Sequence, residues 1–332
     1  MATALTGCVR PKGRVLNVFN WEGYIAASTI PEFERSNNCR VRYGTYGSTE
    51  EMLAKVMSGN SGWDVVFPSN TYIQPMRELG LLARLDHRRL PQLSNLEEQF
   101  QTPEWDPGLE WSVPYLHGAT GVLYQASVAK APVAWSDLWT DSYSRRLTML
   151  DDPAEMFAAC LKRLGCSVNS GQDSELRRAR DMAIRQKPLV RAYLNGEARD
   201  QVVAGDILVA QTWTQVASLA MESSDRLRFA FPSEGYALYA DNACVLRESK
   251  RQELAHEFLN YLLEPRVAAA IATEMHSATA NRAAYALLPA SQRNNAVLYP
   301  SREVLARGEW FRPLSNNAQR LRDRYWTEIK SS

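Results

Sequence analysis

The sequence predicts an α/β protein made of two lobes that exchange strands, with a ligand cleft between them. Short apolar segments alternate with amphipathic segments along most of the chain, which is typical of sheets covered by helices. The 332 residues are enough for two hydrophobic cores. Neither a low-complexity linker nor an internal repeat divides the chain, so two interwoven lobes fit better than two independent domains in series.

Residues 14–67 predict a right-handed βαβαβ unit. The strand segments are rich in β-branched and apolar residues, and Ser48 with Glu51 forms a capping box at the start of the second helix. The expected strands are 14–20, 40–46 and 63–67, and the first expected helix is 28–36.

A second set of alternating elements follows this unit. The expected strands are 121–125, 146–150, 207–212, 227–231 and 237–246, and the expected helices are 154–164, 175–185 and 252–263. In the last helix Leu254, Phe258 and Leu262 recur at helical spacing, and Pro265 ends the pattern. Both parts of the chain therefore predict the same class of fold.

The composition argues against several classes of protein. The chain carries 38 Lys and Arg against 37 Asp and Glu, so its net charge of +1 predicts no broad nucleic-acid-binding surface. No run of about 18 apolar residues predicts a membrane span. The four histidines are scattered, and GxGxxG, Walker A and HExxH motifs are missing. We therefore expect neither a cofactor nor a metal site.

The N-terminal residues Leu-Thr-Gly-Cys at 5–8 resemble the end of a bacterial lipoprotein signal, although no intact signal peptide precedes them. Cys8 is therefore a candidate for lipidation, with a chance cysteine as the alternative. The other cysteines would allow disulfides in an oxidising compartment, but their spacing determines no pairing, and we expect at least two buried free thiols. They are Cys39, Cys160, Cys166 and Cys244.

Polar and aromatic residues gather just past the ends of the expected strands, where open α/β sheets bind their ligands. Aromatic faces combined with carboxylates are typical of a cage for an organic cation. These residues are Trp21, Glu22, Tyr24, Ser69, Asp152, Trp213, Tyr239 and Asp241.

Each of these residues also has a structural interpretation. Asp152, Pro153 and Glu155 have the N-cap, N1 and N3 identities of an ordinary helix start. Trp21 and Trp213 could be core residues. The coincidence of several such features at strand ends favours a ligand site.

Several segments together resemble the bacterial putrescine/spermidine-binding proteins, in order over roughly residues 14 to 330. They are 19–25 (FNWEGYI), 62–76, 113–124, 135–139 (WSDLW), 150–157 (LDDPAEMF), 234–246, 258–268 and 298–310. The resemblance implies a type II periplasmic binding protein fold with crossing hinge segments. It implies one lobe of residues 14–118 plus 242–288 and another of 119–241 plus 289–332.

The resemblance also implies roles for individual residues. It places Trp21, Tyr24 and Ser69 in the first lobe's wall. It implies that Asp152 and Glu155 bind amine groups. It implies that Trp213 stacks against the methylene chain of the ligand. It also implies that Tyr239 and Asp241 complete the opposite wall.

The chain departs from the family pattern at three positions near this site. Gly23 stands in place of an acidic residue, Val216 in place of an aspartate of the putrescine type, and Thr71 in place of a tyrosine of the spermidine type. Fewer carboxylates predict a ligand that is shorter or less cationic than spermidine. Glu22 and Thr71 remain possible ligand contacts.

The resemblance implies the substrate-binding component of an ABC importer, which captures putrescine or a related polyamine in the periplasm. Its expected partners are the small amine and permease subunits of the inner membrane, and it is expected to be a monomer. An ω-amino acid such as 4-aminobutyrate is the alternative ligand, with Arg199 or Arg312 receiving its carboxylate. An enzyme that uses Asp152 and Glu155 as acid and base is disfavoured, because no nucleophile or metal accompanies them.

Overall fold

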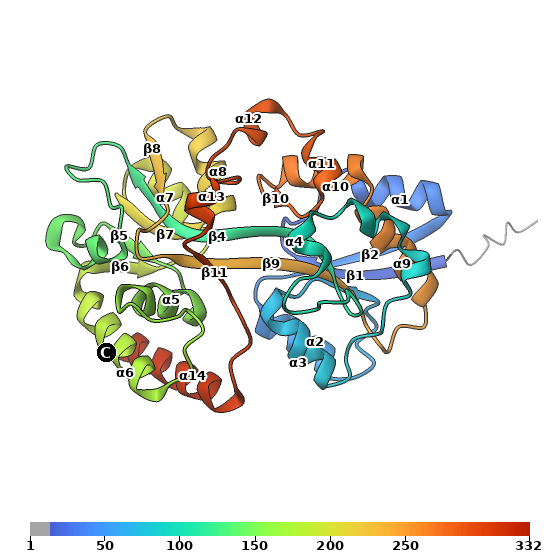
Figure 1. The fold of residues 1–332 in the computed structure, drawn as a ribbon, viewed down its shortest axis with the longest axis horizontal. Coiled ribbons are helices and arrows are strands. Elements are labelled where there is room, and N and C mark those ends of the chain that lie inside the picture. Colours follow the sequence, from blue (N-terminus) through green and yellow to red (C-terminus); the bar gives the residue numbers. More distant parts are fainter. Residues whose placement is uncertain (1–13) are drawn as a thin grey trace, which may run out of the picture.

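The computed structural model describes residues 14–332, which form two α/β lobes joined by long shared strands (Figure 1). β4 (Val113–Gln125) and β9 (Tyr236–Val245) run from one lobe into the other and pair with each other in antiparallel register. The expected two-lobe α/β fold with exchanged strands is confirmed. Cys8 lies outside the described residues.

Lobe 1, on the right in Figure 1, contains the expected βαβαβ unit, because its first strand pairs in parallel with the second and the third. The strands are β1 (Arg14–Trp21), β2 (Cys39–Tyr46), β3 (Val65–Val66) and β10 (Ala278–Thr279). The helices are α1 (Thr29–Asn37), α2 (Thr49–Met57), α3 (Asn70–Glu78), α4 (Glu98–Gln101), α9 (Gln252–Leu262), α10 (Pro265–Glu274) and α11 (Arg282–Tyr285).

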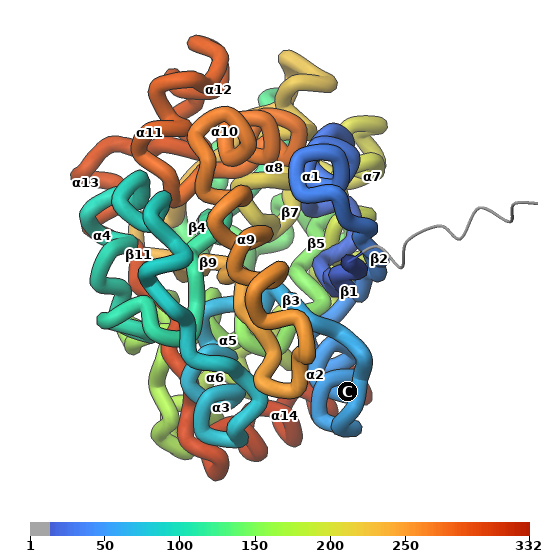
Figure 2. Tube along the Cα trace, turned by 90° about the vertical axis from the view of Figure 1, so that its right-hand side faces the viewer, coloured from blue at the N-terminus to red at the C-terminus, as the bar shows by residue number. Residues whose placement is uncertain are grey.

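The sheet of lobe 1 lies between two layers of helices (Figure 2). Val18 packs into a core with α1, α9 and α10, whereas Phe19, the next residue along β1, packs into a core with α2 and α3. Successive side chains of a strand point to opposite faces, so a continuous apolar run fits a strand covered on both sides.

Lobe 2 covers its sheet with five helices. Its strands are β5 (Leu147–Met149), β6 (Val190–Tyr193), β7 (Val209–Trp213) and β8 (Leu227–Ala230). Its helices are α5 (Pro153–Arg163), α6 (Asp173–Gln186), α7 (Ala198–Ala204), α8 (Thr214–Ser223) and α14 (Asn316–Ser331). A separate core around Trp135, Phe157 and Tyr325 holds this lobe together.

The strands of both lobes form one sheet in the order β2-β1-β3-β9-β4-β7-β5-β6, with β8 and β10 on β4. The chain returns to lobe 2 through α12 (Ala290–Arg293) and α13 (Arg302–Leu305) before β11 (Gly308–Trp310) pairs with β9. The crossing strands therefore connect the lobes without a flexible linker. The lobe boundaries expected from the sequence stay a prediction.

β4 begins at Val113, eight residues before the strand expected at 121–125. Pro114 and Gly118 are unfavourable in an ordinary strand. The structure accommodates Pro114 with a register shift between Pro114 and Leu116. Gly118 lies under Tyr239, where a Cβ atom would be 2.5 Å from the tyrosine hydroxyl oxygen. Packing between strands thus overrides the local preference of these residues.

The expected capping box is half confirmed. The Ser48 side chain accepts a hydrogen bond from the Glu51 amide at 3.2 Å, but the Glu51 carboxylate accepts one from the Gly47 amide. The four cysteines of the described part, Cys39, Cys160, Cys166 and Cys244, are all free thiols, and three of them are buried, as expected. Within residues 14–332, no helix is both long enough and apolar enough to cross a membrane.

Asn70 ties the start of α3 to two crossing segments. Its fully buried side chain donates to the Phe311 carbonyl at 2.6 Å and accepts from the Ala240 amide at 3.2 Å. The neighbouring Ser69 forms an isolated antiparallel bridge with Asp241. These contacts fix the position of α3 relative to the strands that join the lobes.

Replacing Asn70 by alanine should lower the free energy of unfolding by about 2–3 kcal/mol, because two buried backbone groups lose their partner. Urea unfolding followed by circular dichroism measures this change. Asn317→Ala removes an exposed amide from α14 and should change stability by less than about 0.5 kcal/mol. Equal stability of the two variants would show that the Asn70 contacts contribute little.

Candidate functional site

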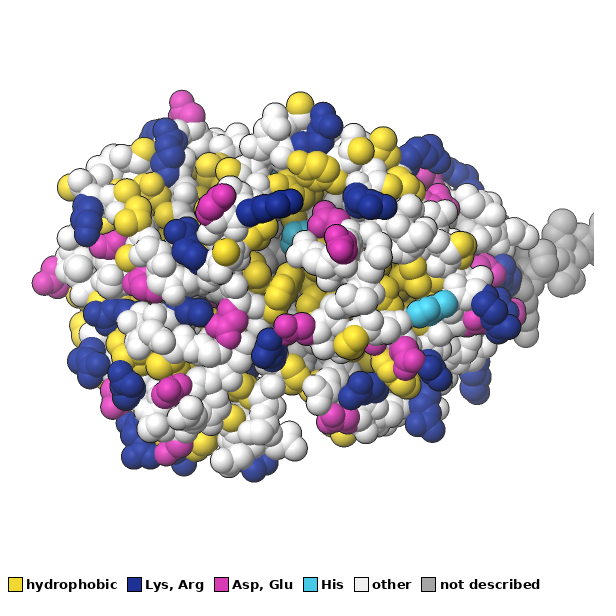
Figure 3. Space-filling model, in the orientation of Figure 1, with side chains coloured by type: hydrophobic (Ala, Val, Ile, Leu, Met, Phe, Trp, Pro, Cys, Tyr) yellow, Lys and Arg dark blue, Asp and Glu magenta, His cyan; other side chains and the backbone are white. Residues whose placement is uncertain are grey.

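The candidate site lies where the two lobes meet, and the molecular surface is hollowed between them (Figure 3). Trp21 and Trp213 end β1 and β7, while Ser69 and Asp152 are the N-cap residues of α3 and α5. Tyr239, on the crossing strand β9, lies between the side chains contributed by the two lobes.

Asp241 is the carboxylate on the lobe 1 side of the site. It is 6% exposed, and its Oδ2 atom accepts a hydrogen bond from the Tyr24 hydroxyl at 2.9 Å. Tyr24 is held in turn, because its carbonyl accepts a hydrogen bond from the Tyr115 hydroxyl at 2.9 Å. Burial raises the pKa of Asp241 to about 7. A buried carboxylate with a raised pKa gains strongly from a nearby cation.

Trp21 packs against Tyr46, a residue close enough to Asp241 for the carboxylate charge to raise its pKa. Its indole Nε1 donates to the Phe67 carbonyl at 2.9 Å, and its ring centroid is 4.7 Å from that of Tyr46. Tyr46 donates to the same carbonyl at 2.8 Å. Trp21 is only half-buried, so its ring is held in a fixed orientation while part of it stays accessible.

Glu155 is the carboxylate on the lobe 2 side. It is 4% exposed, and its Oε1 atom accepts a hydrogen bond from the Trp213 indole at 2.9 Å. Its Oε2 atom is buried and has no hydrogen-bond partner among residues 14–332. Burial and the neighbouring Asp152 charge raise the pKa of Glu155 to about 8. The neighbouring Thr120 side chain partly offsets this rise, and an oxygen with unused acceptor capacity can take a hydrogen bond from a ligand.

Asp152 caps α5, as its structural interpretation predicted. Its Oδ1 atom accepts a hydrogen bond from the Glu155 amide at 3.0 Å. Burial also raises the pKa of Asp152. The cap holds one oxygen of Asp152 next to Glu155, so the structural role and a place in the site are compatible.

Tyr239 connects the two carboxylates. Burial raises its pKa well above the usual value, and the charges of Asp241 and Glu155 raise it further, so the ring lies close to both. Tyr239 and Asp241 are two residues apart on β9 and therefore face the same side of the sheet. Hydrogen bonds, a strand bridge and charge interactions thus link seven of the predicted site residues, which are Tyr24, Ser69, Asp152, Glu155, Trp213, Tyr239 and Asp241.

The other candidate contacts are placed less centrally. Glu22 is exposed, and Thr71 is half-buried on α3. Arg199 on α7 pairs with Asp200, with 2.8 Å between Nε and Oδ1.

The guanidinium of Arg312 binds both carboxylate oxygens of Glu104, at 2.8 and 3.0 Å. Both arginines proposed from the sequence, Arg199 and Arg312, therefore already have acidic partners.

The backbone explains one departure from the family pattern. Gly23 has a φ of +60°, which glycine adopts easily and an acidic residue adopts only with strain.

The structure adds residues that the sequence did not indicate. Thr120 pairs with Trp213 across β4 and β7, and its buried hydroxyl has no hydrogen-bond partner in the described part of the chain. Its segment, 113–120, was not predicted as a strand, although residues 113–124 are among those that resemble the family. Tyr46 ends β2, and the rule that located Trp21 at a strand end could have located it too.

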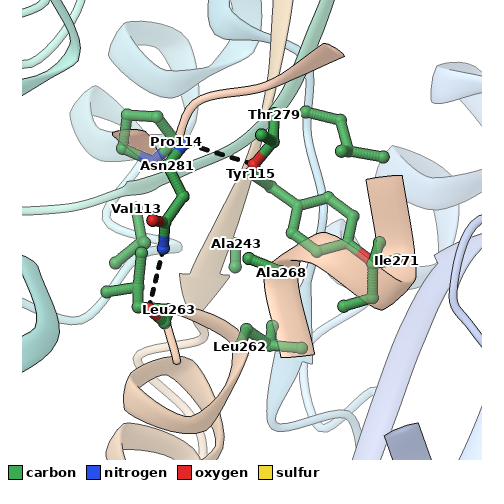
Figure 4. Close-up of a pocket in the computed structure, with 11 residues that line it drawn as sticks. Val113, Pro114, Tyr115, Ala243, Leu262, Leu263, Ala268, Ile271, Thr279 and Asn281 are labelled. Atoms are coloured by element: carbon green, nitrogen blue, oxygen red, sulfur yellow. Dashed lines mark hydrogen bonds between the residues drawn. The ribbon is translucent and has the colours of Figure 1, made fainter. Parts of the chain in front are cut away.

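A small cavity elsewhere in lobe 1 is distinct from this site (Figure 4). It holds about 10 Å³ and lies behind the Tyr115 ring, among apolar residues such as Leu262 and Ile271. That volume accommodates at most one water molecule. Asn281, on its wall, donates to the Leu263 carbonyl at 2.8 Å. The cavity is a packing feature of the lobe 1 core.

Metal binding finds no support in the described residues. Within 14–332, no group of three or more His, Cys, Asp or Glu side chains could hold a metal ion. The carboxylates of the site are instead flanked by aromatic side chains that donate hydrogen bonds, which suits an organic ligand with N–H groups.

Comparison with known proteins gives the family. A family model described as bacterial extracellular solute-binding protein matches residues 29–298. The spermidine/putrescine-binding periplasmic protein of Salmonella typhimurium is 30% identical over 319 residues, which cover 95% of this chain and 91% of that protein. The putrescine-binding periplasmic protein SpuD of Pseudomonas aeruginosa is 31% identical over 338 residues, covering 96% and 92%.

A solved structure agrees with these relatives. The crystal structure of the spermidine/putrescine ABC transporter substrate-binding protein PotD from Streptococcus pneumoniae matches with a TM-score of 0.86 at 27% identity, covering 96% of this chain and 99% of that chain. The family match, the relatives and the two-lobe fold all lead to one assignment: the chain belongs to the bacterial extracellular solute-binding proteins.

Proposed function

We propose that this protein is the substrate-binding component of an ABC importer and captures putrescine, or a closely related diamine, between its lobes. The observation that carries the proposal is a buried carboxylate on each side of an aromatic residue: Asp241 and Glu155, with Tyr239 between them. Relatives named for spermidine, putrescine or cadaverine binding support the same class of ligand.

A diamine suits this arrangement because its two charges lie at opposite ends of a short apolar chain. One ammonium group would donate to Asp241, and the other to the free Oε2 atom of Glu155. The methylene groups would lie against the aromatic rings of Trp21, Trp213 and Tyr239. Each ammonium ion would then be desolvated only where a carboxylate compensates it.

Transport would follow from movement of the lobes about β4 and β9. Closure would bring the two carboxylates onto one ligand, and opening would release it. In this proposal the protein acts as a monomer in the periplasm, hands the amine to permease subunits in the inner membrane, and carries a lipid anchor if Cys8 is modified. It performs no chemical step on its ligand.

A ligand screen tests the proposal directly. Putrescine at about 100 times its dissociation constant should stabilise the protein by about 2.7 kcal/mol in a thermal unfolding assay. Spermidine and spermine should each bind at least about tenfold more weakly, because Asp152 already caps α5 and only Asp241 and Glu155 are left to pair with ammonium groups. 4-Aminobutyrate should also bind at least about tenfold more weakly, because its carboxylate would lie beside a buried carboxylate. Spermidine binding tenfold tighter than putrescine, or stabilisation by 4-aminobutyrate alone, would refute the diamine assignment.

Asp241→Asn should weaken putrescine binding by about 10- to 150-fold, because a buried ammonium group loses its charged acceptor. Calorimetry at pH 8.5 measures the change with the wild-type carboxylate ionised. Asp225→Asn removes the same charge at an exposed position and serves as the control. If both variants bind like the wild type, Asp241 is not part of the site.

Putrescine affinity should rise with pH between about 6 and 8. In the free protein, burial raises the pKa of Asp241 to about 7 and that of Glu155 to about 8, so both hold protons at lower pH. An ammonium ligand favours the ionised carboxylates, so binding releases protons and weakens by up to about tenfold per unit of falling pH for each group. Calorimetry in buffers of different ionisation enthalpy counts the released protons. A putrescine affinity that stays constant between pH 6 and 8 would contradict these pKa values.

A further inference from the structure

A glutamine is fully buried next to the lobe 2 side of the site. Gln211 lies on β7, two residues before Trp213, and its side chain is 0% exposed. Side chains two positions apart on a strand point to the same face, so Gln211 and Trp213 project to the same side of the sheet. A buried side-chain amide is costly unless its polar atoms are hydrogen-bonded, so the partners of Gln211 show what it holds.

The Gln211 amide joins the two ends of the loop that carries Asp152. Its Nε2 atom donates to the Glu155 carbonyl at 3.0 Å, and its Oε1 atom accepts from the Leu150 amide at 3.3 Å. Leu150 directly follows β5, and Glu155 is the third residue of α5. The buried amide therefore clamps the segment 150–155 at both ends.

The bond from Gln211 is not needed to satisfy the Glu155 carbonyl. In an α-helix each carbonyl accepts from the amide four residues later, and α5 continues to Arg163, so this carbonyl has a partner within the helix. A carbonyl oxygen has two lone pairs, and Gln211 uses the second one. The bond thus fixes where the first turn of α5 lies relative to β7.

β7 holds Glu155 a second time, through its carboxylate. The Trp213 indole donates to Glu155 Oε1 at 2.9 Å. β7 is itself paired with β4 and β5, so the sheet sets its position. One strand thus binds the main chain of Glu155 through Gln211 and its side chain through Trp213. Together the two bonds place the remaining oxygen, Oε2, at a defined position beside the sheet.

We propose that Gln211 is a positioning residue, which holds the first turn of α5 against β7 so that the Glu155 carboxylate presents its Oε2 atom to an ammonium group of the ligand. This inference rests on the proposed function as an amine-binding protein. Gln211 acts on the ligand only through Glu155, whose main chain it binds. A binding group held by such supporting hydrogen bonds needs no rearrangement when the ligand arrives, which raises affinity.

The test measures putrescine binding by calorimetry at pH 8.5 in the wild type, Gln211→Met and a matched control. Methionine has a similar length but no amide, so Gln211→Met should weaken putrescine binding about three- to tenfold, the effect of losing one positioning hydrogen bond. The control, Gln125→Met, removes another buried lobe 2 glutamine whose Nε2 atom donates to a main-chain carbonyl, that of Val202. Gln125 is the last residue of β4, and its replacement should leave putrescine affinity within about twofold of the wild type.

A double-mutant cycle tests the route through Glu155. Glu155→Gln should itself weaken putrescine binding, because an ammonium group loses its charged acceptor. In that background Gln211→Met should change the affinity by less than about twofold, because the carboxylate that Gln211 positions is gone. An equal loss in both backgrounds would show that Gln211 does not act through Glu155 and would overturn the inference.

Amide hydrogen exchange tests the clamp without any ligand. The Leu150 amide donates to Gln211, so its exchange should be at least about tenfold faster in Gln211→Met and unchanged in Gln125→Met. Unchanged exchange at Leu150 in Gln211→Met would refute the clamp, whether or not an amine binds.

The outcomes separate this inference from the proposed function. A wild type that binds neither putrescine nor spermidine refutes the proposed function, whereas exchange at Leu150 still decides whether the clamp exists. If the wild type binds putrescine, equal affinity in Gln211→Met, or an equal loss in Gln125→Met, refutes the positioning role. Should Gln211→Met fold poorly, Gln211→Asn keeps a polar amide on a shorter side chain, so it should lose the bond to Glu155 and weaken binding to a similar extent.

Discussion

Two carboxylates held out of water at the junction of the lobes are the constraint on which the rest of the site depends. Asp241 and Glu155 are almost fully buried, and burial raises the pKa of both. An ionised carboxylate is stable in such surroundings only when hydrogen bonds or a cation compensate it. Tyr24 and Trp213 each donate one hydrogen bond, which leaves each carboxylate able to accept more. The site is therefore arranged to gain most from a ligand rich in N–H donors.

The crossing strands bring these groups together. β9 carries Tyr239 and Asp241 on one face, and Gly118 of β4 leaves room for the tyrosine ring. Because both strands continue into each lobe, the floor of the site is part of the sheet and not a loose connection. Asn70 adds a link from α3 to the same strands. The floor of the site therefore belongs to both lobes, whereas each wall belongs to one lobe.

The arginines near the junction divide into two kinds. Arg199 and Arg312 are half-buried or exposed and have acidic partners outside the site, so their charges are already balanced. Arg322, on α14, has no salt bridge within residues 14–332, and its Nε atom is buried there without a hydrogen-bond partner. The near-zero net charge of the chain hides this difference, because the local pairing of charges, and not their sum, determines the field at the ligand.

The sequence by itself determined the α/β class, the βαβαβ unit of lobe 1 and the strand-end positions of Trp21, Ser69, Asp152 and Trp213. These features follow from local apolar patterns, capping residues and the rule that parallel strands present their carboxyl ends at one edge. Resemblance to a known family added Glu155, which no local pattern separates from an ordinary helix residue.

Only the tertiary structure decided what depends on distant contacts. The first half of β4 contains Pro114 and Gly118, and it is a strand because β9 and the Tyr239 ring pack against it. Thr120 joins the site through the same strand. Glu155 and Asp241 lie 86 positions apart along the chain, and only the meeting of the two lobes places both beside Tyr239. Local patterns record secondary structure, whereas the balance of buried charge depends on which segments meet when the lobes fold together.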